Sequence, residues 1–239
     1  MKINCLNLNK EYENIKALDS INLNLEIGLN LLIGRNGAGK STLLNVLSTV
    51  VKPTSGKVEY NQKNIFCKEY KKRLGYLPQD FGIYNNLTGY EFLMYMAMIK
   101  GLDKKNAMKI IKEYLGIFNL SNNSNKALNT YSGGMKQRVG IIQSLLNSPD
   151  VLILDEPFNG LDPFERKTFK EILNSLATNK IIILSSHVLS ELEELNGYTI
   201  LIEKGKIIST IHIKDLVKES GKISLEEYYF KNVEKEINK

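Results

Sequence analysis

The chain has 239 residues, 43% of them hydrophobic, so it can bury a full core and fits one α/β domain. Its 32 Lys and Arg against 26 Asp and Glu give a scattered net charge of +6, compatible with an anionic nucleotide, a phospholipid surface or RNA. The two cysteines lack metal-ligand spacing, and no apolar run approaches the roughly 20 residues of a membrane span, so we expect a soluble chain in a reducing cytosol.

Apolar and polar residues alternate at the start of the chain. Residues 3–8 predict a short strand, and residues 21–27 show the period of two that is typical of a half-buried antiparallel strand. Residues 30–33 are mostly apolar, as in a buried parallel strand. We therefore expect an antiparallel sheet against a parallel core. In the loop after the first strand, Tyr12 either stacks on an adenine face or covers apolar strand ends.

Residues 34–42 fit the pattern G-x-x-x-x-G-K-[S/T] in full, between a predicted strand and a helix that runs to about Val51. Glycines let backbone N–H groups point inward, and the helix N-terminus adds free donors and partial positive charge. Lys40 would reach the β/γ-phosphates, and the Ser41 hydroxyl would bind Mg²⁺. The alternative is a glycine loop that only joins strand to helix. The predicted nucleotide-binding set is Gly34, Asn36, Gly37, Ala38, Gly39, Lys40, Ser41 and Thr42.

Further strands are predicted at residues 57–60 and 74–77. Gln79 follows the second, at a strand end where α/β sheets place ligand residues. Residues 81–131 then show only helical patterns, the first with a capping box at residues 88–91. These residues predict a helical insertion into the α/β core.

A second helix start with free N–H groups follows the insertion. Ser132 is a good N-cap, and Gly133 and Gly134 leave the backbone donors uncovered, so this turn resembles the phosphate loop in its physics. One such helix N-terminus suffices for one nucleotide, so the second requires an explanation. Either it also binds an anion, or it is a Gly-Gly turn that only starts a helix.

Residues 151–154 predict a buried parallel strand that carries Asp155 and Glu156 to the sheet edge. Asp155 would hold Mg²⁺, directly or through water. Glu156 would orient and deprotonate the attacking water, a contribution of about 10²–10⁴-fold. Two solvated acids in a turn are the alternative. Asp162 then caps a helix that begins with a proline.

Residues 181–184 predict another buried strand, followed by His187. This histidine either donates to a γ-phosphate oxygen or caps the following helix. The segments 198–202 and 206–211 flank a hairpin turn, and a capped, charged helix from Ser224 completes the chain.

Together these segments resemble the nucleotide-binding subunit of ATP-binding cassette (ABC) proteins over essentially the whole chain. The ordered set that carries the resemblance is residues 34–42, Gln79, residues 131–135, residues 151–156, residues 160–162 and His187. The resemblance implies an α/β fold, a P-loop NTPase parallel-sheet core with an N-terminal antiparallel β subdomain and a helical insertion. The single domain would divide into 1–80 (antiparallel β and P-loop core), 81–131 (helical insertion), 132–212 (rest of the α/β core) and 213–239 (C-terminal helical extension).

In this family two cassettes stack head to tail. Each nucleotide lies between the phosphate loop of one subunit and the signature motif of the other, to which residues 131–135 correspond here. The resemblance implies that Ser132, Gly133 and Gly134 bind the γ-phosphate held by the partner chain. Gln79 would contact Mg²⁺ or the water, Asp162 would act across the interface, His187 would sense the γ-phosphate, and Tyr12 would stack on adenine. The signature of the family usually reads Leu-Ser-Gly-Gly-Gln, and here Tyr131 and Met135 replace its first and last residues. Arg35 stands in the phosphate loop where the family commonly has Pro. These departures remove no backbone donor.

The implied activity is that of an ATPase subunit of a membrane transporter, with ATP and Mg²⁺ as cofactors. Its partners would be a separate transmembrane permease and a second cassette, in a homodimer or a pair, without direct nucleic acid. It would lie in the cytoplasm, on the inner face of the membrane through the permease. The segments 74–82, 86–91 and 225–229 look like bacterial exporters of the ABC-2 type.

Aromatic and apolar residues after Gln79 would either dock the permease or form the core of the insertion, and they are Phe81, Ile83, Tyr84, Tyr90 and Phe92. A soluble ABC ATPase of the cluster-assembly or another non-transport type is the alternative function. A catalytically silent scaffold is disfavoured because Lys40, Glu156 and His187 are all present.

Overall fold

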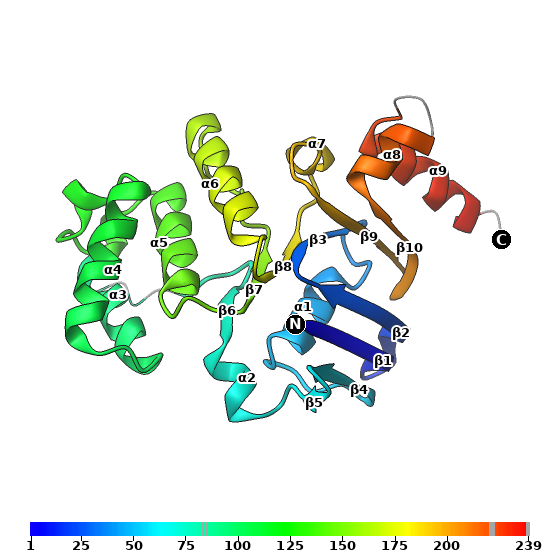
Figure 1. Ribbon diagram of the computed structural model, residues 1–239, viewed down its shortest axis with the longest axis horizontal. Helices are drawn as coiled ribbons and strands as arrows, with labels where there is room; N and C mark the ends of the chain where they lie inside the picture. The colour runs from blue at the N-terminus through cyan, green and yellow to red at the C-terminus, as the bar shows by residue number, and fades with distance from the viewer. Residues whose placement is uncertain (83, 85, 220–222, 238–239) are drawn as a thin grey trace.

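An antiparallel sheet is formed by the N-terminal part of the chain in the computed structural model, which describes residues 1–82, 84, 86–219 and 223–237 (Figure 1). Strands β1 (Lys2–Tyr12) and β2 (Ile15–Glu26) form a long hairpin, and β4 (Ser55–Tyr60) and β5 (Lys63–Asn64) extend it in the order β2-β1-β4-β5. Alternate residues of β2 are buried, as their period of two predicts. The hairpin is longer than predicted because pairing continues to the register Tyr12–Ile15.

The second sheet has six strands in the order β10-β9-β3-β8-β7-β6. The parallel strands are β3 (Gly28–Ile33), β6 (Leu74–Leu77), β7 (Val151–Asp155), β8 (Ile181–Ser185) and β9 (Gly197–Glu203). Strand β10 (Lys206–His212) adds an antiparallel edge to β9. All residues of β7 and β8 are buried, which agrees with their continuous apolar sequence. The predicted pair of sheets is therefore confirmed.

Helix α1 (Lys40–Leu47) lies between the two sheets. Its buried Leu43, Leu44 and Leu47 belong to one apolar cluster with residues of both sheets, such as Leu25 of β2 and Ile153 of β7. The helix ends before the predicted Val51 because Thr49 adopts a left-handed backbone conformation with φ 63. This layering places the start of α1 at the edge of the sheet where the parallel strands end.

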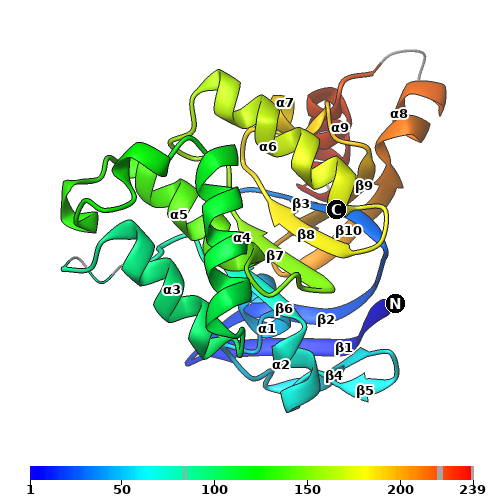
Figure 2. The ribbon, with the colours of Figure 1, turned by 60° about the vertical axis from the view of Figure 1, so that its left-hand side comes forward.

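The other face of the six-stranded sheet carries the helical insertion and the helices that follow it (Figure 2). The insertion contains α3 (Gly89–Ile99) and α4 (Lys104–Ile117), and α5 (Gly133–Leu145) packs against both and against β6. Thr88 and Glu91 form the predicted capping box, and Asp103 caps α4. Helix α6 (Pro163–Leu176) joins the same apolar cluster through Phe169 and Leu173.

Four shorter or terminal helices complete the fold: α2 (Lys68–Lys72), α7 (Leu189–Leu192), α8 (Ile213–Glu219) and α9 (Leu225–Ile237). Helices α8 and α9 pack on β10, and α9 also contacts α7. The sequence pattern missed α2, which is too short for a clear helical period. None of the helices in the described part of the chain combines the length and the hydrophobicity that a membrane span requires. The four subdivisions set by residue number stay a prediction.

Candidate nucleotide site

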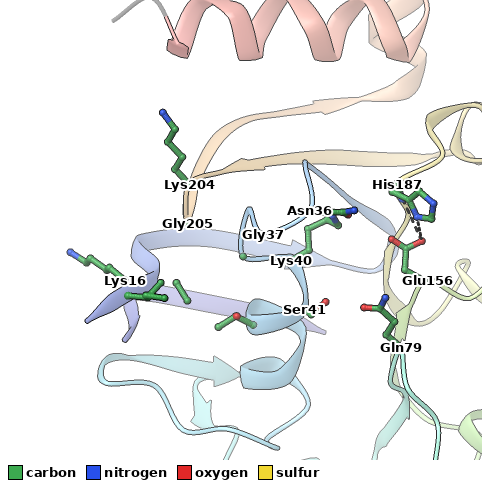
Figure 3. Close-up of a pocket in the computed structure, with 14 residues that line it drawn as sticks. Lys16, Asn36, Gly37, Lys40, Ser41, Gln79, Glu156, His187, Lys204 and Gly205 are labelled. Atoms are coloured by element: carbon green, nitrogen blue, oxygen red, sulfur yellow. Dashed lines mark hydrogen bonds and ion pairs between the residues drawn. The ribbon is translucent and has the colours of Figure 1, made fainter. Parts of the chain in front are cut away.

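A cavity of about 520 Å³ opens where β3, β6, β7 and β8 end (Figure 3). Parallel strands deliver their following residues to one edge of a sheet, where α/β folds bind ligands. The phosphate loop (residues 34–42) forms one wall, and residues after β6, β7 and β8 form the opposite wall. The lining residues are Ile15, Lys16, Ala17, Asn36, Gly37, Gly39, Lys40, Ser41, Thr42, Gln79, Glu156, His187, Lys204 and Gly205.

Two glycines allow the phosphate loop to lie against its neighbours. A Cβ atom on Gly34 would overlap the carbonyl oxygen of Ile202. One on Gly39 would lie 2.6 Å from the carbonyl oxygen of Ala17, and the φ of Gly39 is 109. Gly39 is also the N-cap of α1 and has no side chain to bond the first N–H groups. The turn therefore offers backbone donors to an anion in the cavity.

Lys40 begins α1 and is 7% exposed. Its Nζ donates to the carbonyl oxygens of Gly34 at 2.8 Å and Arg35 at 3.1 Å. Burial lowers the pKa of Lys40, and the nearby carboxylates, Glu156 foremost, oppose that shift. The two carbonyls thus hold a buried ammonium beside the cavity, where phosphate oxygens could replace them as acceptors.

Asp155 and Glu156 are 3% and 7% exposed at the end of β7. Ser185, which is level with Asp155 in the parallel register, donates its hydroxyl to Asp155 Oδ1 and accepts from the Glu156 N–H at 3.0 Å. Glu156 has φ 51, a left-handed conformation that a non-glycine residue adopts at a cost. That turn directs the Asp155 carboxylate to the sheet edge and the Glu156 carboxylate into the cavity, as Figure 3 shows for Glu156.

The Nδ1 atom of His187 lies 2.8 Å from Glu156 Oε2, and the backbone N–H of His187 donates to the same oxygen at 3.4 Å. A carboxylate only accepts, so Nδ1 carries the proton in this contact. The predicted helix-capping alternative is wrong, because Val188 is the N-cap of α7. The contact leaves Glu156 Oε1 for another partner. The γ-phosphate role of His187 stays a prediction.

The structure brings most of the predicted site residues together. Gln79 and His187 face the phosphate loop across the cavity, and buried Asp155 lies beside Glu156 (Figure 3). Tyr12 does not line the cavity: it is 41% exposed at the end of β1, under the ammonium of Lys10 at 4.8 Å. Its stacking role stays a prediction.

Sequence reasoning missed Ser185 and two lysines of the cavity wall, Lys16 and Lys204. Ser185 could have been found from its position before His187 at a strand end. Lys16 is the second residue of β2, and the packing of the two sheets brings it to the cavity. Lys204 follows β9, which pairs in parallel with β3, so it ends at the same sheet edge as the phosphate loop.

The predicted signature residues form a different face. Ser132 caps α5 by accepting from the Met135 N–H at 3.2 Å, and Ser132 and Gly133 are exposed. A Cβ on Gly134 would overlap the carbonyl oxygen of Gly160, so α5 begins directly against the loop 159–162. Asp162 is exposed and caps α6. None of these residues lines the cavity described above.

Tyr131 is 5% exposed and donates its hydroxyl to the carbonyl oxygen of Asn123 at 2.7 Å. The aromatic residue that replaces the usual leucine is therefore part of the insertion's core. It leaves the donors of the helix start free.

Residues 18–159 match the ABC transporter family. The bacitracin transport ATP-binding protein BcrA of Bacillus licheniformis is 41% identical over 225 residues, which are 92% of this chain and 72% of that protein. The lantibiotic transport ATP-binding protein SrtF of Streptococcus pyogenes is 36% identical over 204 residues, which are 84% of this chain and 87% of that protein.

Solved structures agree with these relatives. The ATP-binding subunit of an ABC transporter superposes with a TM-score of 0.89 and 27% identity, over 98% of this chain and 100% of that one. A dimeric ATP-binding cassette in a post-hydrolysis state, bound to ADP and Pi, superposes with a TM-score of 0.81 and 25% identity, over 88% and 98%. The predicted α/β fold and the predicted ATPase activity are thereby confirmed. The chain belongs to the ABC transporter family, as one of its ATP-binding and ATP-hydrolysing cassettes.

Proposed function

We propose that the chain is the ATPase subunit of a bacterial exporter of the ABC-2 type, which pairs head to tail with a second cassette and drives a separate permease. One observation carries the pairing: the signature face (residues 131–135 and 159–162) lies apart from the cavity of the same chain. Two relatives named as bacitracin and lantibiotic transport proteins support the exporter assignment.

The cavity provides the groups that hydrolysis requires. Lys40 and the N–H groups of the phosphate loop hold the β- and γ-phosphates. Glu156 Oε1 accepts a proton from water as its oxygen attacks the γ-phosphorus, while the bond to the β–γ bridging oxygen breaks. His187 fixes Oε2 of the same carboxylate. The start of α5 from the second chain directs Ser132, Gly133 and Gly134 at the γ-phosphate, so closure depends on ATP.

Mg²⁺ fits the donors at the cavity. Ser41 and Gln79 line it, and Asp155 lies buried beside Glu156 with one carboxylate oxygen already bonded to Ser185. Mg²⁺ prefers oxygen ligands, and it is usually held by one or two carboxylates with substrate phosphates. Within the described residues there is no cluster of three or more His, Cys, Asp and Glu that could hold a metal ion alone. The ion would neutralise charge on the β- and γ-phosphates.

The residues predicted either to dock the permease or to form the core of the insertion differ in burial. Phe92 is 1% exposed and packs against Phe81 at 5.7 Å, so it belongs to the core of the insertion. Tyr84 is 59% exposed and meets exposed Tyr95 edge-on at 5.8 Å. Tyr90 is half-buried, and Ile83 lies outside the described residues.

Exposed apolar residues of α3 extend the surface around Tyr84. Tyr95, Met98 and Ile99 follow helical spacing and are 46%, 52% and 61% exposed. We place the permease contact on Tyr84, Tyr95, Met98 and Ile99, because a patch of this kind on an exposed helix marks an interaction site.

Affinity purification of a tagged Glu156→Gln chain from its own cells, with ATP and mild detergent, tests this function. We expect a polytopic membrane protein in about equal amount. A second chain with Tyr95→Ser and Ile99→Ser added should lose that protein and keep its ATP affinity. A soluble assembly without a membrane protein at any detergent strength would instead support the cluster-assembly alternative.

A further inference from the structure

Arg138 of α5 is a nearly buried cation outside the nucleotide cavity, with its side chain 12% exposed. Its Nη1 donates to the carbonyl oxygen of Phe118 at 2.9 Å and pairs with Glu165 Oε1 at 2.6 Å. Its Nε donates to the carbonyl oxygen of Gly134 at 3.3 Å. One guanidinium therefore contacts the end of the helical insertion, the first turn of α5 and the first turn of α6.

Glu165 extends this contact to the loop before α6. Its Oε2 accepts from the Asp162 N–H at 3.1 Å, and its own N–H donates to Asp162 Oδ1 at 2.9 Å. The carboxylate is 14% exposed, so its two oxygens have fixed and separate partners: Arg138 and the loop 159–162. Each oxygen makes one contact, so the carboxylate bridges the guanidinium and the loop through charge-assisted hydrogen bonds.

The segments that Arg138 joins also pack against one another directly. The start of α5 touches the loop 159–162, where Gly134 leaves no space for a Cβ beside Gly160. Phe118 also packs on Phe169 of α6, with ring centroids 6.0 Å apart, beside the same ion pair. The polar and apolar contacts thus hold the insertion, the signature segment (residues 131–135) and the loop 159–162 as one unit.

We propose that Arg138 is a positioning residue, which sets the signature segment and the loop 159–162 in the one arrangement that completes the nucleotide site of the partner chain. The proposal rests on the head-to-tail function above. Arginine suits this task because its planar fork serves three acceptors at once, whereas a lysine ammonium is a point charge on a flexible stem. Arg138 does not line the cavity of its own chain.

The competing explanation is that the Arg138–Glu165 pair only stabilises the fold, since breaking one partner of a buried pair is destabilising. The two explanations differ in which nucleotide site suffers. A stabilising role affects both sites of a dimer, whereas a positioning role affects only the site that the variant chain's signature completes.

Mixed dimers with two affinity tags separate these cases. One chain carries Lys40→Ala, so the only competent site combines the phosphate loop of the normal chain with the signature of the Lys40→Ala chain. Arg138→Met in the Lys40→Ala chain should lower ATP turnover roughly 10- to 100-fold, the size expected of a misplacement by about 1 Å. The same substitution in the other chain should change turnover less than about twofold. Arg138→Lys should give an intermediate loss with the same asymmetry, and it replaces Arg138→Met if that variant does not fold.

Two controls keep the outcomes apart. Ser132→Arg in the Lys40→Ala chain tests the head-to-tail site itself. If neither Ser132→Arg nor Arg138→Met shows the asymmetry, the proposed pairing is wrong. If only Ser132→Arg shows the asymmetry, the pairing stands and the role of Arg138 is wrong. Equal losses of turnover with Arg138→Met in either chain of the dimer also overturn that role. Arg73→Lys, in an exposed pair with Asp150, is the matched arginine control and should leave turnover unchanged.

Discussion

The phosphate-loop face and the signature face of this chain each contain a helix N-terminus, yet the two differ in how far their polar groups are buried. Around Lys40, the charged groups of the cavity and its edge are buried, and they bond to backbone carbonyls or to Ser185. Around Ser132, the helix start is exposed, lies outside this cavity and packs against the loop 159–162. In the proposed function, the first face is a preformed half-site, and the second is a surface for another chain.

The difference shows how one chain can bind ATP alone and yet need a partner for hydrolysis. The two faces rest on different apolar clusters, one around α1 and the other around α5 and α6. Gln137 of α5 links them, since its Nε2 donates to the carbonyl oxygens of Glu156 and Pro157, each at 3.2 Å. The signature helix is thus bonded directly to the backbone of Glu156.

Glu156→Gln has the largest expected effect on the phosphate-loop face. ATP affinity should persist because Lys40 and the loop are untouched, while turnover should fall about 10²–10⁴-fold with the loss of the base. Phosphate release and equilibrium ATP binding measure the two quantities. Glu59→Gln, at a carboxylate of β4 that pairs with Lys57, is the control. Normal turnover in Glu156→Gln would refute the assignment of the base.

Ser132→Arg tests the signature face and should lower turnover by roughly 10²-fold. The bulky side chain would hold the start of α5 away from the γ-phosphate that the partner chain binds. ATP binding to the monomer should be unchanged, since Ser132 does not line the cavity. Isothermal titration of the monomer and a turnover assay of the dimer measure these. Ser121→Arg, on an exposed residue of the insertion, serves as the control. Loss of monomer binding would mean that the two faces are not separate.

The preformed face was largely predictable from the sequence, because its elements are contiguous patterns. The phosphate loop and the strand before Asp155 each act within a few residues of chain. Ser185 and Lys16 were missed because parallel register and sheet packing bring them to the site, and neither leaves a local period. Phe92 shows the converse: a helical aromatic pattern does not tell core from dock until Phe81 is seen packed on it.

The network of Arg138 is also beyond a local pattern. Arg138 stands next to the signature in sequence, but its partners Phe118 and Glu165 lie 20 and 27 residues away on other helices. Only the packing of α4, α5 and α6 turns an ordinary basic residue into a contact between three segments. The faces that meet another chain are therefore the part of the site where sequence patterns say least about geometry.

Lys100 gives the smallest effect and concerns how α3 of the insertion is attached to the segment after α5 and to the start of β6. It caps α3, and its Nζ donates to Asn147 Oδ1 at 3.0 Å. The Asn147 side chain in turn donates to the carbonyl oxygens of Lys72 and Leu74, at 3.0 Å and 3.3 Å. Burial lowers the pKa of Lys100 from 10.5 to about 8.

Between pH 8 and 10.5 the folded state has lost the Lys100 proton that the unfolded chain still binds, so the free energy of unfolding rises with pH across this window. Relative to Lys100→Met, the unaltered chain should gain about 1–2 kcal/mol between pH 7.5 and 10, a value reduced for the partial exposure of the side chain. Denaturant unfolding of both proteins at several pH values measures the difference and cancels the contributions of other lysines. A difference that stays constant with pH would show that Lys100 remains charged at this junction, and that α3 is held there by an ammonium.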